Sequence, residues 1–231
     1  MSSISSTSYA ENVKKKLWLS YKKQKIIPGK MPDKQIQLDF VEKYNWLLEK
    51  AKNNEIVIMF YDPVHQLHNS MPWNCRIEKG KEVYLNSNTW RSRLTAMWWI
   101  NPLTCEFDWI IIEDSCNTES TKATFTEIRK AYKDIPITII LDNAKYNRAY
   151  EVQNHARSIW ITLEFLPPYS PNLNLIERLR KFMKKVLVKN RYYKTLDEFR
   201  NIFNWFFENL GIYKKELLEI FNHRFHILNA A

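Results

Sequence analysis

Two acidic residues follow apolar runs at positions where a carboxylate could do chemistry. Asp62 closes the run EIVIMFYD, and Asp142 closes ITIILD. Such runs are typical of buried strands in an α/β sheet, and polar groups at strand carboxyl ends face the crevice where ligands bind. Two carboxylates at adjacent strand ends repel each other unless a cation lies between them, and such oxygen ligands suit Mg²⁺ or Mn²⁺. Either Asp alone could equally begin a turn.

A third acid, Glu177, lies in SPNLNLIERLRKFMKK, which is predicted to form a helix. Asn174 followed by Glu177 matches a capping box, and Glu177 could form an i,i+4 ion pair with Lys181. At about 100° per residue, Glu177 falls opposite the apolar stripe, on the face that carries the basic residues. A lone acid among bases is either a solvated ion pair or a metal ligand in a phosphate-binding surface. The helix alone leaves both possibilities open.

Apolar periodicity and turn residues predict the elements that must position these acids. The predicted strands are residues 55–62, 78–86, 92–101, 107–114, 137–143 and 162–167. The predicted helices are residues 36–52, 121–134, 147–158 and 174–190, with a last helical pair in 195–223. This order predicts one mixed-sheet α/β domain at 36–215, preceded by an extension at 1–35 and followed by a tail at 216–231.

The composition narrows the partners and the compartment. The chain has 231 residues, of which 45% are hydrophobic, and a formal net charge of +10, which favours a polyanionic partner, nucleic acid first. Three glycines form no nucleotide-binding loop, and three cysteines without CxxC spacing suit a reduced cytosolic protein. Acidic membrane lipid ranks second to nucleic acid as the polyanion, and no membrane is predicted as a partner. No apolar run reaches about 18 residues, so a membrane span is not expected.

Three blocks contain the acids: FYDPVHQLHN, TIILDNAKYNRA and LPPYSPNLNLIERLRKFMKK. With these blocks, over roughly residues 20–210, the chain resembles the transposase catalytic domain of bacterial insertion sequences in the mariner superfamily. The third block is the most specific, and the 34 residues between Asp142 and Glu177 match the spacing that marks that superfamily. The resemblance implies an RNase H-like fold, a mixed sheet flanked by helices, with Asp62, Asp142 and Glu177 as its Asp-Asp-Glu triad.

The resemblance also implies a reaction. The triad would hold two divalent ions, Mg²⁺ or Mn²⁺, for nicking DNA at transposon ends and for strand transfer into target DNA. The protein would assemble on DNA as a homodimer, in the bacterial cytoplasm and on the nucleoid. His65 is expected to support the site, and Asn143 to orient Asp142 or contact the phosphate. Basic residues of the third block could bind DNA phosphates with salt-sensitive affinity: Arg178, Arg180, Lys181, Lys184 and Lys185.

The chain departs from that family's pattern in two places. No helix-turn-helix module is readable in residues 1–35, which we interpret as a remnant of a DNA-binding region. Arg180 stands where the family usually has Trp, a change that could alter packing or DNA contact at the site. Three hypotheses therefore stay open: a metal-dependent DNA-strand transferase, a catalytically inactive DNA-binding remnant that modulates a full-length transposase, and an RNase H-like nuclease.

Overall fold

The computed structural model describes residues 32–69, 71–87, 92–112 and 115–228. The extension predicted at residues 1–35 lies almost wholly outside this part of the chain. Within it, no helix is both long and apolar enough to cross a membrane. All three cysteines are free thiols.

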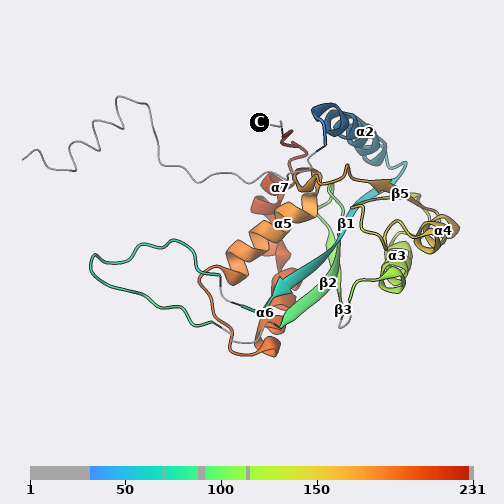
Figure 1. Cartoon of the computed structure of the whole chain (residues 1–231). Coiled ribbons are helices and arrows are strands. Elements are labelled where there is room, and N and C mark those ends of the chain that lie inside the picture. The colour runs from blue at the N-terminus through green and yellow to red at the C-terminus, as the bar shows by residue number, and fades with distance from the viewer. Residues whose placement is uncertain (1–31, 70, 88–91, 113–114, 229–231) are drawn as a thin grey trace, which may run out of the picture.

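Five strands form one mixed sheet in the order β3-β2-β1-β4-β5 (Figure 1). The pairs β1·β2 and β2·β3 are antiparallel, whereas β1·β4 and β4·β5 are parallel. Phe60 of β1 lies beside Ile140 of β4, so Asp62 and Asp142, two residues further along, emerge at neighbouring positions. The strands are β1 (Val57–Leu67), β2 (Arg93–Ile100), β3 (Phe107–Ile112), β4 (Ile137–Leu141) and β5 (Ile161–Phe165).

Helices cover both faces of the sheet, with α3 and α4 on one side and α5, α6 and α7 on the other (Figure 1). Successive side chains of a strand point to opposite faces. Met59 and Tyr61 therefore join the core under α3 and α4, whereas Phe60 and Val64 join the core under α5. Asp62 shares the face of Phe60 and Val64. The helices are α2 (Lys34–Lys52), α3 (Thr118–Ala131), α4 (Tyr150–Ser158), α5 (Leu175–Met183), α6 (Leu196–Glu208) and α7 (Lys214–Ile220).

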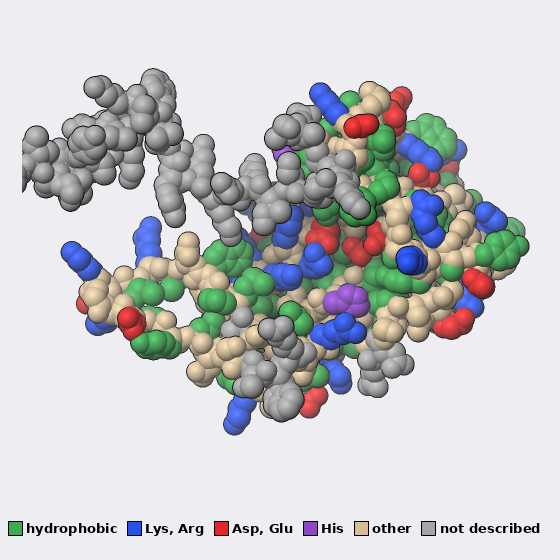
Figure 2. Space-filling model, in the orientation of Figure 1, with side chains coloured by type: hydrophobic (Ala, Val, Ile, Leu, Met, Phe, Trp, Pro, Cys, Tyr) green, Lys and Arg blue, Asp and Glu red, His purple; other side chains and the backbone are tan. Residues whose placement is uncertain are grey.

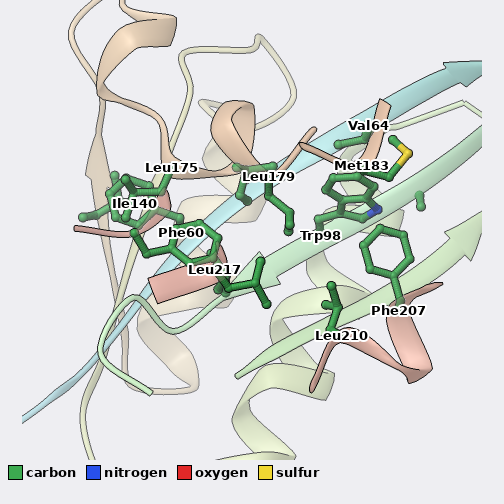
Figure 3. Packing of buried hydrophobic residues seen from close by; sticks show 14 of the residues in the cluster. Phe60, Val64, Trp98, Ile140, Leu175, Leu179, Met183, Phe207, Leu210 and Leu217 are labelled. Atoms are coloured by element: carbon green, nitrogen blue, oxygen red, sulfur yellow. The ribbon is translucent and has the colours of Figure 1, made fainter. Parts of the chain in front are cut away.

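The apolar stripe of α5 anchors this helix on the sheet. Leu175, Leu179 and Met183 recur at helical spacing, are completely buried, and pack in one cluster with Phe60 and Trp98 of β1 and β2 (Figure 3). Fully burying one such side chain contributes about 2 kcal/mol. The packing therefore fixes the helix face that carries Glu177 relative to the strand that carries Asp62.

Two strand predictions are wrong, each for a physical reason. β1 does not end at Asp62 but continues to Leu67, because residues beyond Asp62 still pair with β2. The predicted strand at 78–86 is absent from the described chain: these residues belong to a connection that extends away from the sheet (Figure 1). Val83 and Tyr84 of this segment are 67% and 84% exposed, so they have little to pack against.

The C-terminal segment packs against the domain that it follows. The Tyr44 hydroxyl of α2 hydrogen-bonds His223 Nδ1 at 2.7 Å, and Arg178 of α5 donates to the carbonyls of Ile220 and Arg224 at 3.0 and 2.6 Å. The predicted tail at 216–231 thus includes the end of α7 and residues tied to α2 and α5.

Candidate active site

Asp62, Asp142 and Glu177 line one pocket of about 430 Å³. They come from β1, from the residue after β4 and from the first turn of α5. The loop at residues 166–171 forms another wall of the pocket. On this face of the molecule, Asp and Glu side chains lie recessed near the centre, with Lys and Arg side chains beside them (Figure 2). The fold therefore brings together the three acids of the predicted triad.

The surroundings of Asp62 disfavour its charged form. Burial raises the pKa of its carboxyl well above the usual range, and the negative charges of Asp142 and Glu177 raise it further. The positive charge of Arg180 and a hydrogen bond from Asn174 Nδ2 to Asp62 Oδ2, at 2.7 Å, oppose this rise only in part. The positive charge near Asp62 therefore does not fully compensate its carboxylate. A bound cation would supply the missing positive charge.

Asp142 is held from two directions. Its Oδ1 accepts hydrogen bonds from Asn147 Nδ2 at 2.8 Å and from the Ala144 backbone N–H at 3.0 Å. Asn147 is completely buried, so its bond is shielded from water. These two donors leave the other carboxylate oxygen, Oδ2, without a hydrogen-bond partner among the described residues. Sequence reasoning missed Asn147, although an amide five residues after the acid was visible in LDNAKYN.

Glu177 does not form the predicted capping box or the predicted pair with Lys181. The side chain of Asn174 does cap α5, by accepting from the Ile176 N–H at 3.0 Å, but Glu177 does not bond back to it. Glu177 Oε2 instead bonds Arg180 at 2.7 Å. Residues three apart on a helix are neighbours. Glu177 lines the pocket, and the charge of Arg180 acts on Asp62.

The two predicted supporting residues, His65 and Asn143, form their hydrogen bonds with groups other than the three acids. His65 Nδ1 hydrogen-bonds Thr95 Oγ1 at 3.1 Å, and burial, with the nearby charges of Arg93 and Arg180, lowers the pKa of its imidazole. Asn143 lines the pocket, but its amide donates to the Leu166 carbonyl at 2.5 Å. The side-chain amide that hydrogen-bonds Asp142 is that of Asn147.

The five basic residues of α5 and the turn that continues it have different surroundings. Arg178 binds carbonyls of the C-terminal segment, and Arg180 binds Glu177. Burial and the charge of Arg180 lower the pKa of Lys184. Lys181 and Lys185 are exposed. The face predicted to bind phosphates is thus partly occupied by structural contacts.

The donor set fits a hard divalent cation, although the side chains are not arranged as a closed cage. In the described part of the chain, no three His, Cys, Asp or Glu residues form a group that could hold a metal ion as they stand. Three carboxylates nevertheless line the same pocket, and their repulsion raises the pKa of Asp62. Carboxylate oxygens are the ligands that Mg²⁺ and Mn²⁺ prefer. A cation between the carboxylates would remove their repulsion.

Residues 57–200, from β1 into α6, match the DDE superfamily endonuclease family. The matched region contains all three acids. The chain belongs to this family. The prediction of a DDE-type catalytic domain is thereby confirmed.

Solved structures of the Mos1 transposase share the fold of this chain. The Mos1 strand transfer complex matches with a TM-score of 0.65 and 12% identity, over 94% of this chain and 67% of that chain. The Mos1 mariner paired-end complex with Mn matches with a TM-score of 0.67 and 13% identity, over 94% of this chain and 68% of that chain. The Mos1 catalytic domain matches with a TM-score of 0.56 and 11% identity, over 86% of this chain and 94% of that chain. The predicted RNase H-like mixed sheet flanked by helices is confirmed.

One relative matches by sequence. The "Uncharacterized protein y4pE/y4sA" of Sinorhizobium fredii (strain NBRC 101917 / NGR234) is 33% identical over 84 residues, or 36% of this chain. The match spans 60% of the length of that relative.

Proposed function

We propose that this chain is the catalytic domain of a transposase, which cleaves DNA at transposon ends and transfers the cut strand into target DNA. The observation that carries the proposal is the convergence of Asp62, Asp142 and Glu177 on one pocket. Membership of the DDE endonuclease family supports it, as do the structural neighbours, which include strand-transfer and paired-end complexes of Mos1.

The three carboxylates would hold Mg²⁺ or Mn²⁺, and we propose two ions, with Asp142 at the centre as the shared ligand. Bound metal would supply an activated water or DNA 3′-hydroxyl and would stabilise the leaving oxygen of an in-line displacement at phosphorus. The Mos1 paired-end complexes with Mn and with Mg support this choice of ions. No protein side chain needs to act as the nucleophile.

The protein's own residues would orient the acids and receive the DNA. Asn147 holds Asp142 in one orientation, and Asn174 does the same for Asp62. Glu177 would have to turn from Arg180 toward the other two acids, which would free the Arg180 guanidinium at the pocket for a DNA phosphate. Charge-assisted bonds of Arg to phosphate are among the stronger hydrogen bonds in proteins.

DNA is the partner that the charge of the chain favours. The net charge is +10, and Lys181 and Lys185 are exposed on the surface beyond Glu177. The exposed lysines would add affinity that does not depend on base sequence and falls with salt. We propose that two copies assemble on paired transposon ends. The structural likeness to the Mos1 transposase paired-end complex with left transposon end supports this proposal. The protein would then work in the bacterial cytoplasm, on the nucleoid.

Strand joining tests the proposal. Purified protein is incubated with pre-nicked transposon-end DNA and plasmid in Mn²⁺, beside an Asp142→Asn control. This control keeps the side-chain shape, and its amide oxygen can still accept the bonds from Asn147 and Ala144. We expect joined product from the wild type alone. Cleavage without joining would indicate a plain RNase H-like nuclease, and DNA binding without either reaction would indicate an inactive remnant.

A further inference from the structure

Asn174 lies at the junction between a short 3-10 turn, Pro171–Leu173, and the first residue of α5. Its side chain lines the catalytic pocket three residues before Glu177, yet only 3% of the residue is exposed. A buried amide must satisfy both its donor and its acceptor, because leaving either unpaired costs about 1–3 kcal/mol. The hydrogen-bond partners of Asn174 therefore identify the two elements that its side chain connects.

The two ends of this amide bind two different elements. Oδ1 accepts from the Ile176 N–H at 3.0 Å, which caps α5, and Nδ2 donates to Asp62 Oδ2 on β1 at 2.7 Å. The orientation of the amide follows from these partners, because a backbone N–H can only donate and an ionised carboxylate can only accept. A flipped amide would place two donors together at α5 and two acceptors together at β1.

Other capping residues cannot reproduce this pair of bonds. Ser and Thr are good caps, but their side chains are too short to reach from the Ile176 N–H to a carboxylate on another element. An ionised Asp would cap α5 but would offer an acceptor, and a negative charge, to Asp62. Asparagine combines a cap with a donor of the right length.

We infer that Asn174 is a positioning residue: it locks the first turn of α5, which carries Glu177, to Asp62, and so sets the separation of the two carboxylates. Glu177 follows within the same helical turn, so its backbone moves with the cap. That this separation governs binding of a divalent cation rests on the proposed function. The link itself does not, because it is formed by the two hydrogen bonds alone.

The link is tested first without metal. Urea unfolding in EDTA is measured for the wild type, Asn174→Ser, Asp62→Ala and the double variant. Serine keeps a cap but removes the donor, so its effect on the unfolding equilibrium constant should be roughly tenfold larger when Asp62 is present than when Ala replaces it. Equal effects in both backgrounds would overturn the inference.

Asn172 provides a matched control in the same loop. Its Nδ2 donates to Gln37 Oε1 at 3.1 Å and to the His226 carbonyl at 2.8 Å, away from the acids. The effect of Asn172→Ser should therefore add to that of Asp62→Ala without coupling. Coupling of similar size between Asn172→Ser and Asp62→Ala would mean that this comparison of single and double variants, a double-mutant cycle, reports general loosening of the loop. That result would also overturn the inference.

The consequence for the cation is tested by titrating Mn²⁺ alone into the protein in a calorimeter. Loss of a partner that orients a metal ligand costs roughly 10–100-fold in affinity, so Asn174→Ser should bind Mn²⁺ that much more weakly, whereas Asn172→Ser should match the wild type. Wild-type affinity in Asn174→Ser would show that Asn174 is only a cap. If the wild type binds no Mn²⁺, the proposed function fails, and the metal-free cycle still decides whether Asn174 holds Asp62.

Discussion

In the metal-free protein, Asp62→Asn should raise the free energy of unfolding at pH about 8, although it removes a group that the proposed reaction needs. Asp62 is half-buried beside two other acids, and desolvation together with their negative charges opposes its charged form. An asparagine carries no charge, and its side-chain oxygen can still accept the bond that Asn174 donates to Asp62 at 2.7 Å. The substitution therefore removes repulsion without leaving a buried donor unpaired.

The pH dependence of this effect has a definite sign. The pKa of Asp62 is raised in the folded protein, whereas an Asp in the unfolded chain titrates near about 3.9. Between these two values the folded state binds more protons than the unfolded state, so the free energy of unfolding falls as the pH rises. The stabilisation from protonated Asp62 is complete below the unfolded pKa and is lost as the pH rises through the folded pKa.

The assay is urea unfolding in EDTA at pH about 5 and about 8 for the wild type and Asp62→Asn. A tenfold change in the unfolding equilibrium, about 1.4 kcal/mol, is the smallest stabilisation that we expect from the substitution at the higher pH. For a chain of this size it corresponds to a rise of about 3–5 °C in melting temperature. Asp134→Asn, at an exposed acid, controls for the loss of one negative charge from a basic chain.

Two results would refute this reasoning. One is an Asp62→Asn variant that is no more stable than the wild type at the higher pH, which would mean that Asp62 does not repel its neighbours. The other is a gain of equal size in Asp134→Asn, which would assign the effect to net charge. Added Mg²⁺ should narrow the difference, because a ligand that binds only the folded wild type stabilises it.

Three further predictions concern other residues. Asn147→Ala should weaken Mn²⁺ binding by roughly 10–100-fold in calorimetry, because Asp142 loses a donor at 2.8 Å; unchanged binding would contradict this role. Trp160 has φ +59° and is 74% exposed, so Trp160→Gly should raise the calorimetric melting temperature by about 2–4 °C, whereas Trp160→Ala, which keeps the Cβ, should not. Replacing exposed Lys181 and Lys185 with Ala should reduce the slope of log K against log salt in DNA-binding anisotropy by about 0.9 for each DNA phosphate that the variant no longer neutralises; an unchanged slope would exclude this surface from DNA binding.

Local sequence patterns predict the elements whose burial is uniform. ITIIL is buried at every position and forms β4, as its β-branched run indicates. The apolar spacing of Leu175, Leu179 and Met183 likewise predicts the buried face of α5. The resemblance added the triad, because nothing local to Asp62, Asp142 or Glu177 requires that the three acids meet.

The sequence misses features that depend on neighbours far along the chain. Pro63 and polar residues after Asp62 argue against a continuing strand, yet β1 continues to Leu67. Parallel pairing with β4 ends at Phe60, so Pro63 has a strand neighbour on one side only, where a missing N–H is tolerated. The bond from Asn174 to Asp62 spans 112 positions, and the local pattern predicted a capping box with Glu177 instead.

The most direct test of a divalent-metal DNA-cleaving centre at Asp62, Asp142 and Glu177 is nicking of supercoiled plasmid by purified protein. We expect the wild type to nick the plasmid in Mn²⁺ or Mg²⁺ and not in EDTA. Asp142→Asn should nick more slowly by more than about 100-fold. That factor is the upper end of the loss expected when only a hydrogen-bond partner of a metal ligand is removed. A wild type that cuts nothing in either metal, or a variant that cuts as fast as the wild type, would contradict the account.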